Sequence, residues 1–139
     1  MRRVNLVPMA GAGQRFVDAG YTVAKPLIKV NGEPMVVQAA KSLPEADHWI
    51  FICRKEHLRE NGISDDLKRH FPNPEIISVE YLTEGQANTC LLAKNLLRPD
   101  DILTIGACDN AMKYDQVLFE IQISKADALI WTFRNNIAV

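Results

Sequence analysis

The stretch over residues 4–26 places the strongest limit on how this chain can fold. An apolar run over residues 4–9 passes directly into a loop of small residues, and two cations, Arg15 and Lys25, follow that loop. A buried strand that ends in glycines can offer backbone N–H groups to a phosphate, with positive charge close by. We therefore expect a strand and an anion-binding loop here. The loop consists of Ala10, Gly11, Ala12 and Gly13.

The length and charge of the chain narrow the class of protein. Its 139 residues fall within the size range of a single domain, and 47% of them are hydrophobic, as in ordinary globular proteins. The formal net charge is -1, which gives no support to binding of nucleic acid or of an anionic membrane. Any site for an anion must therefore be local.

The cysteines and the N-terminus exclude further classes. The three cysteines are far apart and form no Cys-x-x-Cys pair, which argues against a zinc site or a disulfide framework. Cys53 and Cys108 lie in apolar runs and are expected to be reduced core residues. The apolar stretch near the N-terminus is too short for a signal peptide or a membrane span, so we expect a cytoplasmic protein.

Strand-like apolar runs alternate with helical patterns along the chain. This alternation predicts an α/β fold, a Rossmann-like three-layer sandwich with a mostly parallel sheet and right-handed crossovers. Strands are expected over 4–9, 48–53, 75–82, 102–105 and 128–133, helices over 34–43, 85–97 and 114–124, helical turns over 56–59 and 65–70, and an extended piece over 27–30.

The apolar spacing also predicts which helix faces are buried. In the second long helix the expected inward residues are Ala87, Leu91, Leu92 and Leu96. In the third they are Val117, Leu118 and Ile121. The chain stops shortly after the fifth expected strand, so we expect residues 1–139 to be a single nucleotide-binding domain that forms the N-terminal part of a longer one.

Ligands of open parallel sheets sit at the carboxyl ends of the strands. Two unusual segments follow such ends, residues 10–15 after the first strand and residues 106–110 after the fourth. The glycine loop lacks the Gly-Lys-Ser/Thr of a Walker loop, and Phe16 occupies the third glycine position of the dinucleotide fingerprint. On motif logic alone, the loop is either a phosphate-binding loop or a plain strand-to-helix turn with solvated cations.

A longer sequence pattern, which extends beyond the loop, matches a known protein family more specifically than the glycines alone. The segments AGAGQRF and AGYTVAKPLIKVNGEPMV resemble the signature of the sugar-phosphate nucleotidyltransferases. The resemblance extends more weakly to the segments 84–87 and 108–110. Three positions depart from the family pattern: Gln14 replaces a threonine or serine, Ala24 replaces a proline, and Cys108 replaces a glycine. The positions that match are Gly11, Gly13, Arg15, Phe16, Lys25, Pro26, Leu27, Gly32, Pro34 and Met35.

The resemblance implies transfer of a nucleoside monophosphate from an NTP to a sugar 1-phosphate or a similar phosphate acceptor, with release of pyrophosphate. It implies that the loop of Ala10, Gly11, Ala12 and Gly13 holds the nucleotide, with Arg15 at the β- and γ-phosphates and Lys25 at the α-phosphate. It also implies that Thr83 and Gly85 lie against the base or ribose and that Asp109 holds Mg²⁺. Apart from the resemblance, we expect that the protein can form a homo-oligomer. Phosphoryl transfer depends on such positioning and charge neutralisation.

Two other functions remain open from the sequence. One is a non-catalytic module that binds a nucleotide without a metal. The other is a glycosyltransferase that uses a nucleotide-sugar, although Asp109-Asn110 lacks the usual Asp-x-Asp spacing. The histidines are scattered, and Trp49 and Trp131 are expected in the core. The sequence does not identify the base or the acceptor.

Overall fold

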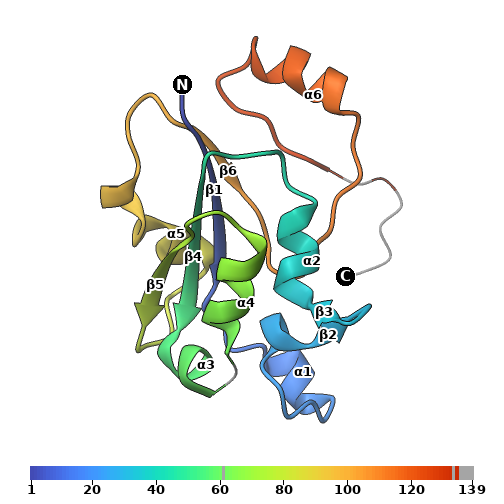
Figure 1. Cartoon of the computed structure of the whole chain (residues 1–139), viewed down its shortest axis with the longest axis vertical. Coiled ribbons are helices and arrows are strands. Elements are labelled where there is room, and N and C mark those ends of the chain that lie inside the picture. The colour runs from blue at the N-terminus through green and yellow to red at the C-terminus, as the bar shows by residue number, and fades with distance from the viewer. Residues whose placement is uncertain (61, 133, 135–139) are drawn as a thin grey trace.

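A computed structural model describes residues 1–60, 62–132 and 134 and confirms the α/β fold. Its main sheet has four parallel strands in the order β5-β4-β1-β6. The sheet is central in Figure 1, with helices packed around it. The strands are β1 (Arg3–Met9), β4 (His48–Arg54), β5 (Glu75–Val79) and β6 (Ile102–Ile105).

The remaining elements are short. A two-stranded antiparallel hairpin, β2 (Lys29–Val30) with β3 (Glu33–Pro34), turns at the Asn-Gly pair 31–32. The helices are α1 (Gln14–Asp18), α2 (Met35–Lys41), α3 (Lys55–Glu60), α4 (Ile63–His70), α5 (Gln86–Leu91) and α6 (Gln116–Ile123), and the 3₁₀ turns are η1 (Lys25–Leu27) and η2 (Lys94–Leu96). Within the part of the chain that is described, no helix has both the length and the apolar character needed to cross a membrane.

An apolar cluster lies on each face of the sheet. The sheet and the helices on its two sides therefore form the three predicted layers. On β1, Val7 and Met9 face α2 and α4, whereas Val4 and Leu6 belong to the cluster that includes Ala93, just beyond α5. This alternation follows from the period of two along a strand. Both faces are covered at β1 and β4, which explains why these two strands are apolar almost throughout.

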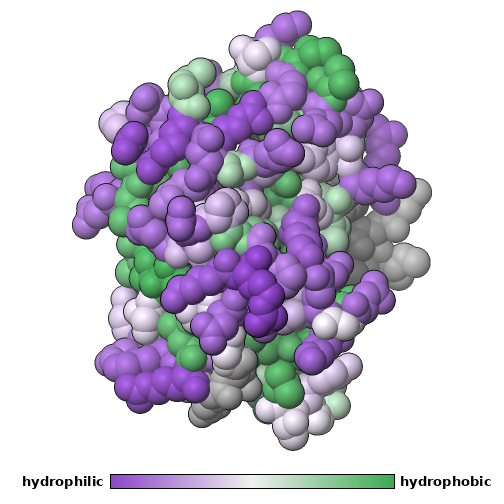
Figure 2. All heavy atoms as spheres, in the orientation of Figure 1, coloured by the Kyte–Doolittle hydropathy of each residue, from purple (hydrophilic) through white to green (hydrophobic). Residues whose placement is uncertain are grey.

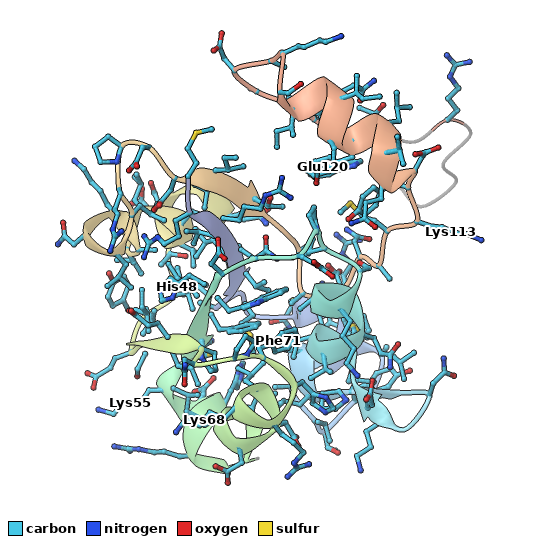
Figure 3. All side chains as sticks on the ribbon, turned by 45° about the horizontal axis from the view of Figure 1, so that its top comes forward. His48, Lys55, Lys68, Phe71, Lys113 and Glu120 are labelled. Carbon is cyan, nitrogen blue, oxygen red and sulfur yellow. The ribbon has the colours of Figure 1, made fainter. Side chains whose placement is uncertain are left out.

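Aromatic side chains fill the layer between the sheet and α4. The ring centroid of Phe71, at the end of α4, lies 4.4 Å from that of Trp49 and 5.2 Å from that of Phe51. Phe71 points into the molecule in Figure 3, while Lys55 and Lys68 point outward. Trp49 is 6% exposed, so its predicted place in the core is confirmed.

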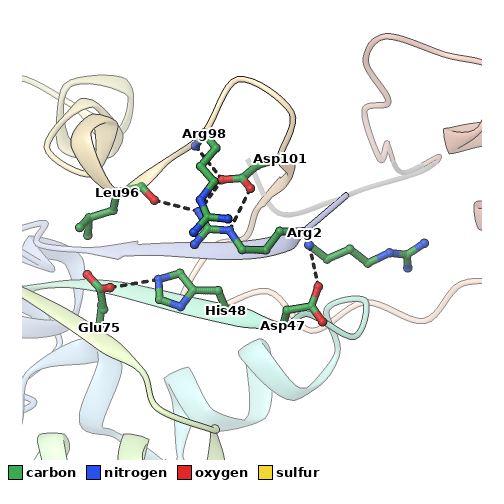
Figure 4. A network of polar contacts seen from close by, with 8 residues as sticks. Arg2, Asp47, His48, Glu75, Leu96, Arg98 and Asp101 are labelled. Carbon is green, nitrogen blue, oxygen red and sulfur yellow. Dashed lines mark hydrogen bonds and ion pairs between the residues drawn. The ribbon is translucent and has the colours of Figure 1, made fainter.

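A polar network joins the elements at the amino ends of β1 and β6 (Figure 4). The guanidinium of Arg2 donates two hydrogen bonds to the Asp101 carboxylate, at 2.9 and 2.6 Å, and a third to the carbonyl of Leu96. Asp101 also accepts from the backbone N–H of Arg98 at 2.8 Å. Since the network lies at the amino ends, it stabilises the scaffold away from the carboxyl ends, where ligands are expected.

Two predictions about the C-terminal third were wrong. Residues 128–132 form no strand, the sheet ends at β6, and Ile130 is 84% exposed; residue 133 lies outside the described residues. The predicted inward face of α6 is exposed instead. Hydrophobic atoms are visible where α6 lies in Figure 2, and Val117, Leu118 and Ile121 are 71%, 51% and 48% exposed.

The expected face of α5 was wrong in part. The helix ends at Leu91 and η2 follows, so the helical period does not continue to residue 97. Leu91 is 64% exposed, whereas Thr89 and Ala93 are buried. Leu96 packs against the core, as expected. An amphipathic pattern thus indicated the helix but not the side on which it packs.

Strand order places the ends of β1 and β6 side by side. The chain continues from β1 to β4 on one side and later returns to β6 on the other, so the direction of winding changes between β1 and β6. Such a switch point leaves an opening at the carboxyl ends of the two strands. The loops after Met9 and Ile105 meet at that opening, as the sequence predicted.

Candidate nucleotide-binding cleft

A cleft of about 260 Å³ lies at the carboxyl ends of β1 and β6. Four separate stretches of sequence line it: the end of β1 with the loop after it, the start of η1, the segment that begins α5, and the loop after β6. We call it the β1–β6 cleft. Its lining residues are Pro8, Met9, Ala10, Gly11, Gly13, Lys25, Pro26, Thr83, Gly85, Gln86, Thr89, Ala107, Cys108 and Asp109.

The glycine loop forms one side of the β1–β6 cleft. Gly13 has a φ of 61° and precedes α1, a left-handed conformation that favours glycine. A Cβ at this position would also lie 3.3 Å from the Cβ of Lys25. Among the hydrogen bonds of the described residues, none is donated by the backbone N–H of Gly11, Ala12 or Gly13. These donors are available to a ligand.

Lys25 and Asp109 face each other across the cleft. The Lys25 Nζ forms an ion pair with the carboxylate of Asp109, and the two side chains are 25% and 31% exposed. Lys25 Nζ also lies 5.4 Å from the centre of the Phe16 ring, within the range of a cation–π contact. Pro26 is buried directly after Lys25 and anchors the start of η1. The ammonium and the carboxylate are therefore held at the mouth of the glycine loop.

The opposite wall is the turn that leads into α5. Gly85 has φ 143° and ψ 175°, a backbone conformation that is essentially restricted to glycine. No heavy atom lies within 4 Å of the position that a Cβ would take at Gly85, so the backbone angle, and not a packed neighbour, requires glycine. The carbonyl of Gly85 accepts the backbone N–H of Thr89 at 3.0 Å. This hydrogen bond from the first turn of α5 stabilises the turn at Gly85.

A second hollow of about 280 Å³ adjoins the cleft along the glycine loop. It shares Gly11, Gly13 and Lys25 with the cleft and adds Ala12, so the loop and Lys25 lie between two concave surfaces. We call it the outer hollow. Its other lining residues are Phe16, Val17, Tyr21, Thr22, Val23, Ala24, Glu56 and His57.

The predicted site residues therefore separate into three groups. Gly13 and six other predicted residues line the β1–β6 cleft, whereas Ala12 lines only the outer hollow. Arg15 lies on α1, is exposed and lines neither surface. The six are Ala10, Gly11, Lys25, Thr83, Gly85 and Asp109.

Half of the cleft lining was not among the predicted site residues, and Gln86 and Thr89 are two of those residues. Gln86 belongs to the segment that carried the weaker part of the resemblance, so its position could have been inferred from that segment. Thr89 is 4% exposed, and a threonine inside a helical pattern gives no indication that it reaches a ligand cleft. Only the turn at Gly85, which brings residue 89 beneath it, places Thr89 there.

Cys108 also lines the cleft, and its surroundings favour the protonated thiol. Burial, with a smaller contribution from Asp109, raises the pKa of its thiol to about 11. Burial raises the pKa of Cys53 to about 12. Both are free and buried, which confirms the prediction of reduced core cysteines. A nucleophilic role at neutral pH needs a thiolate, which these shifts disfavour.

The acidic groups determine how a metal ion could bind. Across the described residues, no three or more His, Cys, Asp or Glu side chains gather into a metal site. Mg²⁺, however, is commonly held by one or two carboxylates together with substrate phosphates and water. Asp109 offers one carboxylate beside the glycine loop. Its chemistry fits Mg²⁺ if phosphates supply the other ligands.

Comparison with known proteins supports the fold. No protein-family model matches this sequence, and no curated protein matches it. Among solved structures, the nucleoside-diphosphate-sugar pyrophosphorylase from Vibrio cholerae superposes with a TM-score of 0.63 at 21% identity, over 84% of this chain and 52% of that one. The UTP-bound UGPase from Acinetobacter baumannii gives 0.62 at 17% identity, over 91% and 54%.

A third structure, the inositol-1-phosphate CTP transferase from T. maritima, gives a TM-score of 0.60 at 18% identity, over 76% of this chain and 43% of that one. The chain spans about half the length of the structures that it matches. Identities this low support the fold and not the substrate. Over that length, the chain has the fold of the nucleotidyltransferases.

Proposed function

We propose that this chain binds a nucleoside triphosphate in the β1–β6 cleft, as the nucleotide-binding part of a nucleotidyltransferase. One observation carries the proposal: a single cleft at the switch point of the sheet gathers backbone donors, a cation and a carboxylate. These are the groups that phosphoryl transfer needs, because its transition state is stabilised by positioning and charge neutralisation. The resemblance and the fold of the neighbours support the same chemistry.

The proposed roles are those that the resemblance implies, and the residues concerned line the cleft. The backbone of Gly11 and Gly13 would hold the phosphates of the nucleotide, because glycine lets a ligand approach without a Cβ in the way. Lys25 would contact the α-phosphate, where negative charge increases during the reaction. Thr83 and Gly85, on the opposite wall, would contact the base or ribose.

The proposed reaction is a substitution at the α-phosphorus. A phosphate oxygen of the acceptor attacks that phosphorus, the bond from the α-phosphorus to the bridging oxygen breaks, and pyrophosphate leaves with that oxygen. We propose a sugar 1-phosphate, or a similar phosphate monoester, as the acceptor. The name of the pyrophosphorylase with the same fold supports this class of acceptor for that protein, and we extend it to this chain as part of the proposal.

We propose that Asp109 has two partners, Lys25 in the free chain and Mg²⁺ when nucleotide is bound. Because Lys25 neutralises Asp109 in the absence of ligand, binding of NTP would move Lys25 towards phosphate and free the carboxylate. Asp109 would then hold Mg²⁺, which supplies charge neutralisation between the phosphates when bound. The pair keeps the carboxylate from repelling the incoming triphosphate.

Arg15 has a proposed role only in the nucleotide-bound state. It is exposed on α1, near the outer hollow but not part of its lining. A triphosphate that follows the loop from the cleft into the outer hollow would bring its β- and γ-phosphates towards α1. We propose that Arg15 contacts these phosphates only when nucleotide is bound.

A thermal-shift panel tests the proposal. The four common nucleoside triphosphates are added one at a time, with Mg²⁺ or with EDTA, and at least one is expected to stabilise the chain more strongly with Mg²⁺. At a hundredfold excess over the dissociation constant, the stabilisation would be about 2.7 kcal/mol. Lys25→Ala should lose most of this shift, whereas Lys68→Ala, at an exposed position on α4, should keep it.

The panel also separates the alternatives. A non-catalytic nucleotide-binding module would show stabilisation that is the same with EDTA. Nucleotide-sugars are added to the same panel, because a glycosyltransferase would respond to them and not to free triphosphates. No stabilisation by any triphosphate would contradict the proposed function altogether.

A further inference from the structure

The wall of the cleft at Gly85 contains a chain of hydrogen bonds. The hydroxyls of Thr83 and Thr89 are 2.5 Å apart. The Thr89 hydroxyl donates to the Gly85 carbonyl at 3.1 Å, whereas the Thr83 hydroxyl reaches the same carbonyl only at 3.4 Å. Thr89 is 4% exposed, so its hydroxyl has little access to water and must find its partners inside the protein.

The distances to the Gly85 carbonyl favour one arrangement of the protons. Each hydroxyl has one proton to donate and two lone pairs to accept with, and either hydroxyl could donate across the contact between them. The arrangement with the shorter contact to the carbonyl has Thr89 donating to Gly85 and Thr83 donating to Thr89. The proton of Thr83 is then used, and its oxygen is left with lone pairs on a residue that lines the cleft. In this arrangement, a ligand group that meets Thr83 is a donor.

We propose that Thr89 is a positioning residue that sets Thr83 as a hydrogen-bond acceptor for an N–H or O–H group of the bound nucleoside. The inference rests on the proposed function, since it assigns a specificity element to the same cleft. The donor on the ligand is either a base N–H or a ribose hydroxyl. The Thr89 hydroxyl donates its proton to the Gly85 carbonyl, so Thr89 accepts from Thr83 and leaves the Thr83 oxygen to accept from the ligand.

Two substitutions at residue 89 separate hydrogen bonding from packing. Thr89→Val keeps the shape of the side chain and removes the hydroxyl, while Thr89→Ser keeps the hydroxyl and removes a methyl group. The Gly85 carbonyl still accepts the backbone N–H of residue 89 in both variants, so the turn is not left without a donor. Circular dichroism and thermal melting establish that both variants fold.

Wild type and Thr89→Ser are expected to bind the nucleotide with the same affinity. Thr89→Val should bind it about threefold to tenfold more weakly, because it lacks one hydrogen bond. The reverse order, with Thr89→Val like wild type and Thr89→Ser weaker, would show a packing role and overturn the inference. Equal affinity in all three proteins would overturn it as well.

A second readout identifies the donor on the ligand. Wild type, Thr83→Val and Thr89→Val are titrated with the four ribonucleoside triphosphates and with the 2′- and 3′-deoxy forms of the tightest one. Loss of the ribose preference in both variants assigns Thr83 to a ribose hydroxyl, and loss of the base preference assigns it to a base N–H. If neither preference changes in the variants, the inference is wrong.

The two proposals fail in different ways. If the wild-type chain binds no nucleoside triphosphate, the proposed function fails and the inference fails with it. If the wild type binds a triphosphate and the variants at residues 83 and 89 bind it with the same affinity and preference, only the inference fails.

Discussion

Lys25 and Asp109 are partners in the free chain, and this determines what a change at Asp109 should do. Asp109→Asn removes the proposed ligand of Mg²⁺, so affinity for NTP in the presence of Mg²⁺ should fall roughly tenfold to a hundredfold. With EDTA the same variant should bind NTP a few times more tightly than wild type, because Lys25 is released and a negative charge is removed. Titrations with and without Mg²⁺ measure both effects.

The control for Asp109 is another exposed aspartate. Asp100→Asn changes a carboxylate before β6, at the opposite end of the strand from the cleft. It should leave both affinities within about twofold of wild type, in line with a surface substitution away from a site. If Asp109→Asn responds to Mg²⁺ as wild type does, Asp109 does not hold the metal.

Gly11 and Gly85 should respond differently to alanine. Gly85→Ala forces φ 143° on a residue with a Cβ and should destabilise the fold by about 1–3 kcal/mol. Gly11 has no positive φ and open space around its Cβ position, so Gly11→Ala should change stability by less than about 0.5 kcal/mol. It should nevertheless weaken NTP binding, because the new methyl group occupies the path of the phosphates. Urea unfolding and NTP titration separate the two effects.

At the level of single residues, the sequence predicted half of the lining of the cleft. Gly11, Lys25 and Asp109 were found because a strand-end rule and a long motif both pointed to them. Thr89 was missed because its place depends on the turn at Gly85, which local pattern does not encode. Arg15 was predicted from its closeness in sequence to the loop, but the helix α1 leaves it outside both concave surfaces.

At the level of elements, the contact between the N-terminus and the loop before β6 makes stability depend on pH. Hydrogen bonds from Arg2 hold the pKa of Asp101 at about 2, below its ordinary value of 3.8. The folded state therefore favours the ionised carboxylate. This contribution is complete above about pH 5 and is lost as the pH falls through 4 towards 2.

Asp101→Asn tests this dependence. The variant should be less stable than wild type at pH 7, and the difference should shrink as the pH falls from 4 to 2, because wild type loses the same contribution there. Urea unfolding at a series of pH values measures the difference. A gap that stays constant down to pH 2 would mean that Asp101 does not titrate with a lowered pKa.

The strands were predicted more accurately than the outer helices. Runs such as residues 48–53 are apolar on both faces, and burial between two layers is the condition that produces such a pattern. Residues 128–132 are also mostly apolar but do not join the sheet, so apolar character alone could not tell a strand from an exposed segment. In α6, likewise, apolar character did not distinguish the buried Phe119 from the exposed Val117, Leu118 and Ile121.

At the level of the whole molecule, the position of the cleft follows from the topology. The order β5-β4-β1-β6 brings together loops from residues 10–13 and 107–109, which are almost a hundred positions apart in sequence. The alternation of strands and helices predicted parallel strands and sites at their carboxyl ends. The strand order itself depends on which edges pair in three dimensions, and the sequence pattern leaves it open.

The central claim is that a nucleoside triphosphate binds in the β1–β6 cleft, and the seven glycines of the chain allow a direct test. Backbone glycine signals are well separated in a two-dimensional ¹⁵N–¹H NMR spectrum, and they can be followed during titration with NTP and Mg²⁺. Gly11, Gly13 and Gly85 line the cleft, whereas Gly32 and Gly62 line neither concave surface. The account predicts saturable shifts of the first three signals while Gly32 and Gly62 stay in place. Shifts confined to Gly32 and Gly62, or no shifts at saturating NTP, would contradict it.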